Sequence, residues 1–398
     1  MLPELRPDVA LVAPYPKIGV RHGGMSGVAS YTANLAHTLA GAGARVVVIA
    51  PAESGEPLEC HDGPVHVRRP FQRGVRAVPA GLSAARRTGA AVVHLQHELF
   101  LYGGPAALPG LLPALTPAVV DRWARAVGRP RRNLTVVTMH QVVDPATVDR
   151  GYARMHRIGV PASVARVGIE AVQDVIRRLA DVVVVHEPSF AKVVPGAVTI
   201  PHGVEVVERS DRRAARAALG VDGRFVALCF GFLAPYKGLE LACSAAEIAG
   251  PRVQLVVAGG PHPRVEERSR YAEALRSRYG GTVRFTGYVD EPDVARWFAA
   301  ADMAVLPYPA PHASSGALAL AIAHRTPVLA SAALARTCGL PDAMAFGSDA
   351  QALAVRLGEL ADDPAARASL VAAVDQLAAG RTWATVARQH LSVYATNT

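Results

Sequence analysis

The sequence predicts an α/β protein built from two doubly wound parallel sheets, each forming a lobe of its own. Three observations lead to this fold class. Short β-branched segments alternate with longer Ala-, Leu- and Arg-rich segments of helical period along the whole chain. The 398 residues exceed the about 250–300 that one hydrophobic core normally serves. The alternation also restarts after a polar segment at residues 205–213, so two sheets of ordinary size are expected.

The first lobe is predicted to comprise residues 1–203. The β-branched segments that predict its strands are residues 9–13, 45–49, 91–95, 135–139, 182–185 and 198–200. One segment breaks the alternation, because four prolines recur every fourth residue, at Pro105, Pro109, Pro113 and Pro117. Proline inside a helix removes a hydrogen bond and clashes with the preceding turn, so no regular helix is expected there.

The proline-rich segment is followed by five arginines, Arg122, Arg125, Arg129, Arg131 and Arg132. A surface loop followed by a solvated helix face is one interpretation of this region. The other is an apolar and basic flap that covers a bound ligand or lies against an anionic membrane surface.

The second lobe is predicted to comprise residues 204–380, and residues 381–398 form a final amphipathic segment with Trp383, Val386 and Leu391 on its apolar side. After a helix at residues 214–219, strands are expected at residues 225–230, 253–258, 283–285, 303–306 and 327–330. No repeat of 20 to 50 residues is found, which excludes solenoids and propellers.

The amino-acid composition excludes several classes of protein. Hydrophobic residues make up 51%, charged residues 19%, and the mean hydropathy is +0.20, which argues against disorder and coiled coils. No apolar stretch approaches the about 18 residues of a membrane span, and no leader is evident, so a cytoplasmic protein is expected. Four widely spaced cysteines suggest neither a zinc site nor a disulfide framework; they are Cys60, Cys229, Cys243 and Cys338.

The net charge of +9 is unevenly distributed. Residues 1–203 hold 22 basic and 14 acidic residues, a net +8, whereas residues 204–398 hold 20 and 19, a net +1. Aromatic residues are only 6%, and no basic and aromatic interleaving appears, so nucleic acid is not expected as a partner. The basic half instead suggests an anionic small molecule or peripheral contact with an anionic membrane.

Ligands of open α/β sheets bind beyond the carboxyl ends of the strands, so we searched for motifs that follow predicted strands. Gly23 and Gly24 precede a helical stretch at residues 28–39 and offer backbone that a ligand can approach closely. Nine residues separate these glycines from the first strand, and their spacing differs from a dinucleotide fingerprint. A nicotinamide-dependent dehydrogenase is therefore disfavoured.

The second lobe carries a sharper pattern, because residues 230–238 follow a predicted strand directly and combine Gly231 and Gly238 with Lys237. Only three lysines occur in the chain, and an ammonium group delivered by a glycine turn can neutralise a diphosphate. Further along, Ser314, Ser315 and Gly316 precede a short apolar helix whose first N–H groups can hold phosphate. A salt-bridged surface lysine and an ordinary Ser/Gly helix cap are the structural alternatives.

In their order and spacing these motifs resemble the GT-B glycosyltransferases, specifically the retaining group of family GT4, also called glycosyltransferase group 1. The resemblance covers nearly the whole chain and includes residues 43–46, 93–98, 137–140, 180–181, 200–204, 231–238, 255–260, 285–289, 301–307 and 326–328. It implies a GT-B fold with two Rossmann-like lobes, an acceptor-binding first lobe, a second lobe that binds a nucleotide-sugar, and a last helix that crosses back to the first lobe.

The resemblance also implies roles for particular residues. The residues matching catalytic positions are His140, beside the transferred sugar, and Lys237, at the donor diphosphate. Those matching donor-binding positions are Gly24, Gly231, Phe232, Lys237, Gly259, Gly287, Tyr288, Ser314, Ser315 and Gly316. Those expected to contact the acceptor are Gly23, His94, His97 and Glu98.

The sequence departs from the family pattern at three positions. Phe232 stands where family members commonly have an arginine, and His312 and Leu320 stand where many have two glutamates. Those glutamates normally contact the sugar and the ribose, so the identity of the donor cannot be carried over from the family.

The activity implied by the resemblance is transfer of a sugar from a UDP- or GDP-sugar to an acceptor hydroxyl, with retention and without metal or other cofactor. A secondary-metabolite scaffold or another small molecule, or a glycan, is the expected acceptor. Two other functions stay open on this fold. A nucleotide-sugar epimerase would need no acceptor, and a non-catalytic binding subunit would show no turnover.

Overall fold

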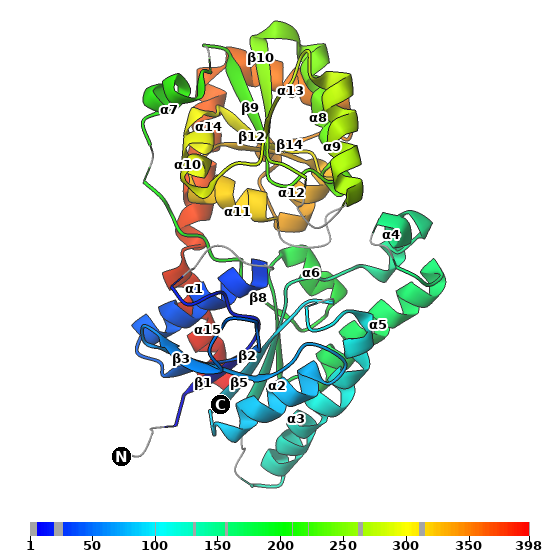
Figure 1. Ribbon diagram of the computed structural model, residues 1–398, viewed down its shortest axis with the longest axis vertical. Coiled ribbons are helices and arrows are strands. Elements are labelled where there is room, and N and C mark those ends of the chain that lie inside the picture. Colours follow the sequence, from blue (N-terminus) through cyan, green and yellow to red (C-terminus); the bar gives the residue numbers. More distant parts are fainter. Residues whose placement is uncertain are drawn as a thin grey trace. The chain divides into compact units, whose positions relative to one another are not determined.

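The computed structural model of the chain consists of two compact units (Figure 1). Unit 1 comprises Met1–Gly203 and Trp383–Thr398, and unit 2 comprises Val204–Thr382. The residues that the structure describes are 6–19, 27–99, 101–129, 133–155, 158–208, 210–221, 223–261, 266–309 and 315–397.

Unit 1 is built on an eight-stranded sheet with strand order β3-β4-β2-β1-β5-β6-β7-β8. All neighbouring strands are parallel except β3 and β4, which form an antiparallel pair at one edge. The strands are β1 (Val9–Val12), β2 (Val46–Pro51), β3 (Glu59–Asp62), β4 (Val65–Phe71), β5 (Val92–His97), β6 (Leu134–Met139), β7 (Val182–Val185) and β8 (Val198–Thr199).

Helices cover both faces of this sheet, as Figure 1 shows. Helices α1 (Gly27–Gly41) and α15 (Trp383–Asn397) pack together over one face. Helices α2 (Ala77–Arg87), α3 (Leu111–Ala126) and α5 (Ala162–Leu179) cover the other. The shorter helices of the unit are η1 (Pro105–Gly110), η2 (Pro145–Thr147), α4 (Arg150–Met155) and α6 (Pro188–Val193).

The proline-rich segment is helical, so the expectation that it excludes a regular helix was wrong. Pro113 lies in the first turn of α3, where a backbone N–H has no intrahelical partner in any helix. Pro117 lies inside α3 and does remove one hydrogen bond. Burial of one apolar side of the helix offsets that loss, and this side consists of Leu111, Ala114, Leu115 and Ala118.

Unit 2 is built on a six-stranded parallel sheet with strand order β11-β10-β9-β12-β13-β14. Its strands are β9 (Phe225–Phe230), β10 (Val253–Ala258), β11 (Arg284–Gly287), β12 (Met303–Leu306), β13 (Val328–Ser331) and β14 (Ala345–Phe346). Its helices are α7 (Arg212–Leu219), η3 (Pro235–Lys237), α8 (Leu239–Ala249), η4 (Gly250–Arg252), α9 (Glu266–Tyr279), α10 (Glu291–Ala300), α11 (Gly316–Ala323), α12 (Ala332–Cys338), η5 (Asp342–Met344), α13 (Ala350–Asp362) and α14 (Pro364–Gly380).

Every strand predicted from the sequence is present with bounds shifted by no more than two residues, but β3, β4 and β14 were not predicted. Strand β4 alternates buried and more exposed residues and includes His66, Arg68 and Pro70. A strand with this alternation resembles a polar segment, whereas the central strands are continuous β-branched runs. The sequence therefore predicts the strands that are apolar runs, including the edge strands β8 and β11, and misses β3, β4 and the two-residue β14.

Candidate functional site

The sheet of unit 2 reverses its strand order between β9 and β12. The chain adds β10 and β11 on one side of β9, then returns to place β12 on the other side. In open α/β sheets such a switch point leaves a crevice beyond the carboxyl ends of the two central strands, and ligands bind there. The motif at residues 231–238 follows β9, and the one at Ser315 follows β12, so both predicted donor motifs belong to the loops at this switch point.

The loop after β9 depends on its glycines. Gly231 and Gly238 have φ of +103° and +66°, a region that side chains other than glycine rarely adopt. A Cβ atom on Gly238 would lie 2.2 Å from the carbonyl oxygen of Pro307, which follows β12. The loops after β9 and β12 are therefore in direct backbone contact.

The neighbouring loop after β10 joins the same cluster. A Cβ atom on Gly259 would lie 2.2 Å from the carbonyl oxygen of Gly231, and the Leu233 N–H donates to the Gly260 carbonyl at 3.0 Å. Gly287 has φ of +78° and forms a bridge with Gly259. The predicted donor residues Gly231, Gly259 and Gly287 thus lie in adjacent loops at one edge of the sheet.

Lys237 is held at the carboxyl end of β9. Its side chain is 7% exposed, and Nζ donates to the carbonyl oxygen of Phe230, the last residue of β9, at 3.2 Å. The turn η3 and the left-handed Gly238 bring the ammonium back over the strand that precedes the loop. A cation held at a strand end and shielded from water attracts an anion more strongly than a solvated surface lysine does.

Helix α11 begins at the same edge with an N-cap serine. Ser315 is 8% exposed, its Oγ accepts from the Leu318 N–H at 3.2 Å, and it donates to the Tyr308 hydroxyl at 3.3 Å. The first helical residue is Gly316, and a Cβ atom there would meet no atom of the described residues within 4 Å. The open start of this helix lets an anion approach its N–H groups.

The remaining donor positions differ in accessibility. Tyr288 is 69% exposed and Phe232 is 37% exposed, so both side chains are open to a ligand. Leu320, which stands in place of a family glutamate, packs against the hydrophobic core of unit 2. Gly23, Gly24, His312 and Ser314 lie outside the described residues.

In unit 1, His140 is part of a chain of hydrogen bonds on the sheet face that α1 and α15 cover. His140 Nδ1 lies 3.1 Å from His186 Nε2, and His140 Nε2 lies 2.8 Å from Gln96 Oε1. Gln96 continues the chain to His94, which lies 2.7 Å from both the Thr138 and the Tyr394 hydroxyls. The His140 ring also makes an edge-on contact with Tyr31 of α1, with 4.7 Å between centroids.

The end of this chain fixes the direction of its hydrogen bonds. His186 Nδ1 lies 2.9 Å from the Ile200 carbonyl oxygen, which can only accept, so Nδ1 carries the proton. When the His186 ring is neutral, its Nε2 carries no proton and therefore accepts from His140 Nδ1.

Burial favours the neutral forms of His140 and His94. It lowers the pKa of His140 well below its ordinary value, and nearby His186, His202, His94 and His97 lower that pKa further. The pKa of His94 is likewise lowered, first by burial and then by His390 and His186. A neutral His140 can accept or relay a proton at neutral pH.

The structure differs from the expectation that His94 and His97 line an acceptor pocket. His94 is fully buried and bonded to Tyr394 of α15, and His97 is 2% exposed and points to the opposite sheet face, because alternate residues of a strand face opposite sides. Both ring nitrogens of His97 lack a hydrogen-bond partner among the described residues, and burial lowers its pKa to about 4. Glu98 is partly exposed, and burial raises its pKa.

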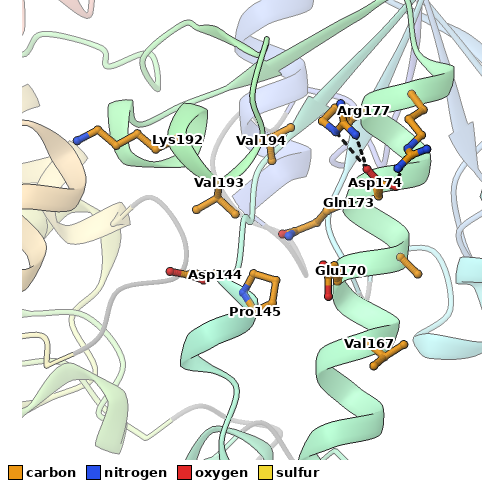
Figure 2. A pocket seen from close by; sticks show the side chains of 12 residues that line it. Asp144, Pro145, Val167, Glu170, Gln173, Asp174, Arg177, Lys192, Val193 and Val194 are labelled. Carbon is orange, nitrogen blue, oxygen red and sulfur yellow. Dashed lines mark hydrogen bonds and ion pairs between the residues drawn. The ribbon is translucent and has the colours of Figure 1, made fainter.

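Unit 1 also contains a charged cavity of about 680 Å³ along α5 and α6. Figure 2 shows Asp174 and Arg177 paired on α5 at one side of it, with Asp144 and Lys192 projecting from other segments. None of the residues predicted from the sequence lines this cavity. Its charged residues are single positions scattered between residues 144 and 192, so no sequence motif predicted this cavity.

Comparison with known proteins shows which family part of this chain matches. Residues 224–363 match the model of the family described as "Glycosyl transferases group 1". A GDP-mannose:glycolipid 4-beta-D-mannosyltransferase of Xanthomonas campestris is 37% identical over 112 residues, which cover 28% of this chain and 30% of that protein. A D-inositol 3-phosphate glycosyltransferase of Thermobispora bispora is 32% identical over 219 residues, half of each chain.

Solved structures share the fold over the full length. Sucrose-phosphate synthase from Thermosynechococcus elongatus has a TM-score of 0.71 and 21% identity, covering 98% of both chains. The Anabaena protein HepE in complex with UDP has a TM-score of 0.65 and 16% identity, covering 98% of this chain and all of that one. The GT-B fold is therefore confirmed, and residues 224–363 belong to the group 1 glycosyltransferases, as the sequence motifs predicted.

Proposed function

We propose that this protein is a glycosyltransferase that moves a hexosyl group from a UDP- or GDP-sugar to an acceptor hydroxyl. The observation that carries the proposal is the switch point of unit 2, where the buried ammonium of Lys237 and the open start of α11 belong to loops in contact. A diphosphate carries two adjacent anionic groups. The ammonium of Lys237 and the first N–H groups of α11 can each bind one of them. The family match spans these same loops.

In this proposal the leaving group is the nucleoside diphosphate. Negative charge grows on its β-phosphate as the glycosidic bond breaks, so Lys237 and the α11 dipole interact more strongly with the transition state than with the bound donor. Their positions are fixed before the reaction, since Lys237 is held by the Phe230 carbonyl and α11 by its Ser315 cap. No rearrangement is then required while the charge develops.

In this proposal unit 1 binds the acceptor, and His140 is the residue of unit 1 assigned to stabilise charge on the transferred sugar. The hydrogen-bonded chain through Gln96 and His186 sets the orientation and protonation of its ring. A neutral imidazole in that position stabilises positive charge on the sugar ring better than an imidazolium would.

We further propose that transfer needs no metal and proceeds with retention, the departing phosphate taking the proton of the acceptor on the same face of the sugar. Two experiments test these points, one for the metal and one for the stereochemistry of transfer. Activity is expected to survive chelation by EDTA, and loss of turnover in EDTA would contradict the proposal that no metal is needed. One relative is named for a beta-D-mannosyl product, so the anomeric configuration of the product must be read by NMR.

The experiment that tests this function is incubation of the full chain with UDP- and GDP-hexoses, in the presence and absence of acceptors extracted from cells. Acceptor-dependent release of nucleoside diphosphate, lost in Lys237→Ala, supports a glycosyltransferase. Formation of a free sugar isomer without acceptor would identify an epimerase instead. Nucleotide binding without any turnover would identify a binding subunit.

A further inference from the structure

Helices α3 and α5 of unit 1 expose apolar side chains that a globular protein normally buries. Seven of the fifteen large, exposed apolar side chains among the described residues lie on α3, on α5 or directly beside them. On α3, Leu112, Val120 and Trp123 lie on one side of the helix, and Trp123 is 64% exposed. On α5, Val164 and Val167 are 54% and 66% exposed. An exposed apolar surface of this kind marks a binding surface.

A groove lies within this apolar surface. Its volume is about 780 Å³, and it is lined by η1, the start of α3, and α4 and α5. The lining side chains include Leu108, Leu112, Ile158, Val164 and Val172, and Tyr152 supplies the only hydroxyl among the described lining residues. The volume is that of a ligand site, but most ligand sites place several polar groups where a sugar or nucleotide would need them. A hydrocarbon chain has no such need.

The charged cavity of Figure 2 adjoins this groove, because Ala171 of α5 lines both. The cavity presents Asp144, Glu170 and Lys192, together with the paired Asp174 and Arg177. An apolar groove next to a charged cavity matches a molecule with a hydrocarbon chain and a polar head.

Arginine side chains lie close in sequence to the exposed apolar side chains of α3. Arg125 and Arg129 are exposed and flank Val127, one turn beyond Trp123. Apolar side chains that enter a membrane surface, flanked by cations that meet anionic head groups, are typical of peripheral membrane contact. A peptide is a poorer occupant, because it would bring polar backbone groups to a groove whose described lining carries a single hydroxyl.

We propose that this groove binds the hydrocarbon chain of a membrane lipid, and that the lipid carries the acceptor hydroxyl. The second part rests on the proposed glycosyltransferase function and names its acceptor class, a lipid rather than a soluble small molecule. One relative is named as acting on a glycolipid, which is consistent with this choice. Unit 1 then binds a lipid-linked acceptor in this groove at a membrane surface.

Gly168 offers a direct test of the groove. It lies on α5, lines the groove, is exposed, and a Cβ atom there would meet nothing within 4 Å. Gly168→Trp should fill the groove while preserving the helix, since replacing a helical glycine favours helix formation. The matched control is Gly41→Trp, at the exposed end of α1 in the same unit, where a Cβ atom also meets nothing.

The probe is cis-parinaric acid, a fluorescent long-chain fatty acid. Wild type and Gly41→Trp should bind it with equal affinity, and Gly168→Trp should bind it about tenfold or more weakly. Absence of binding to the wild type, or equal binding to Gly168→Trp, would overturn the assignment of the groove.

Flotation with vesicles tests the membrane part. The wild type should bind phosphatidylcholine vesicles that contain phosphatidylglycerol, and salt should weaken this binding. Trp123→Glu and Val164→Glu should abolish it, whereas Val355→Glu, at a residue 51% exposed in unit 2, should leave it unchanged. Vesicle binding that is absent, or unaffected by either unit 1 substitution, would contradict the proposal.

Neither measurement needs a nucleotide or a transfer reaction, so the two proposals can fail separately. Lipid binding without nucleotide turnover would contradict the proposed function and leave the groove assigned. Turnover with a soluble acceptor, in a protein that binds neither probe nor vesicles, would contradict only the lipid inference.

Discussion

Lys237 is the residue whose chemistry is most specific in unit 2. Its Nζ is held at the end of β9, where it can meet the charge that develops on a leaving diphosphate. Lys237→Ala should raise the barrier to turnover by about 2–4 kcal/mol, the range for one oriented donor, while donor affinity falls less. Lys237→Arg should rescue only part of this loss, because the guanidinium is larger and forked. Unchanged steady-state turnover in Lys237→Ala would show that the lysine is structural.

Gln96 is the second residue with a defined consequence, because its amide links His140 to His94. Gln96→Leu should lower kcat by about ten- to a hundredfold through loss of ring orientation, with KM little changed. Gln96→Glu should place a carboxylate against His140 Nε2 and raise the pKa of His140, which moves the acidic limb of the pH–rate profile to higher pH. Gln254→Leu in β10 is the matched control. A Gln96→Glu enzyme with the wild-type pH profile would contradict the assignment of Gln96 as a positioning residue.

At the scale of the elements, the sequence predicted what depends on local pattern. Central strands such as β6 and β10 are continuous apolar runs, and the loop after β9 is recognised by its glycines and lysine. The chain of Gln96, His140 and His186 could not be predicted, because its members lie on β5 and directly after β6 and β7 and meet only in the final register, where Gln96 pairs with Thr138. The only sequence feature that indicated this hydrogen-bonded chain was the alternation of polar residues at the strand ends.

Helix α15 joins the end of the chain to the first unit. Trp383 packs against Tyr31 with 5.1 Å between centroids, and His390 Nε2 lies 3.1 Å from the Tyr31 hydroxyl. Val386, Ala387 and Tyr394 are buried in the same core as α1. Deleting residues 381–398 should therefore destabilise unit 1 and expose the histidine chain, seen as a loss of cooperative thermal unfolding. A truncated chain with the melting temperature of the wild type would show that α15 is dispensable.

The whole molecule should respond unequally to acid, because the buried histidines are concentrated in unit 1. Burial lowers the pKa of His97 to about 4 and of His390 to about 3, and lowers those of His94 and His140 well below the ordinary 6.5. Below pH 6.5 these histidines bind protons in the unfolded chain but stay neutral in the folded chain. The free energy of unfolding therefore decreases as the pH is lowered. Each such histidine costs about 1.4 kcal/mol per pH unit within that window.

Hydrogen exchange followed by mass spectrometry can report both units in one sample. Between pH 7 and pH 5, protection of β5, β6 and α15 in unit 1 should fall well before that of β9 and β10 in unit 2. In unit 2, His324 is the one histidine among the described residues. Simultaneous loss of protection in both units would contradict this explanation.

The claim that unit 2 holds a nucleoside diphosphate at its switch point is tested most directly by titration calorimetry with UDP and GDP. We predict that at least one of them binds the wild type with a one-to-one stoichiometry, and that Lys237→Ala and replacement of the α11 cap in Ser315→Ala each weaken that binding. Failure of the wild type to bind either nucleotide would contradict the account.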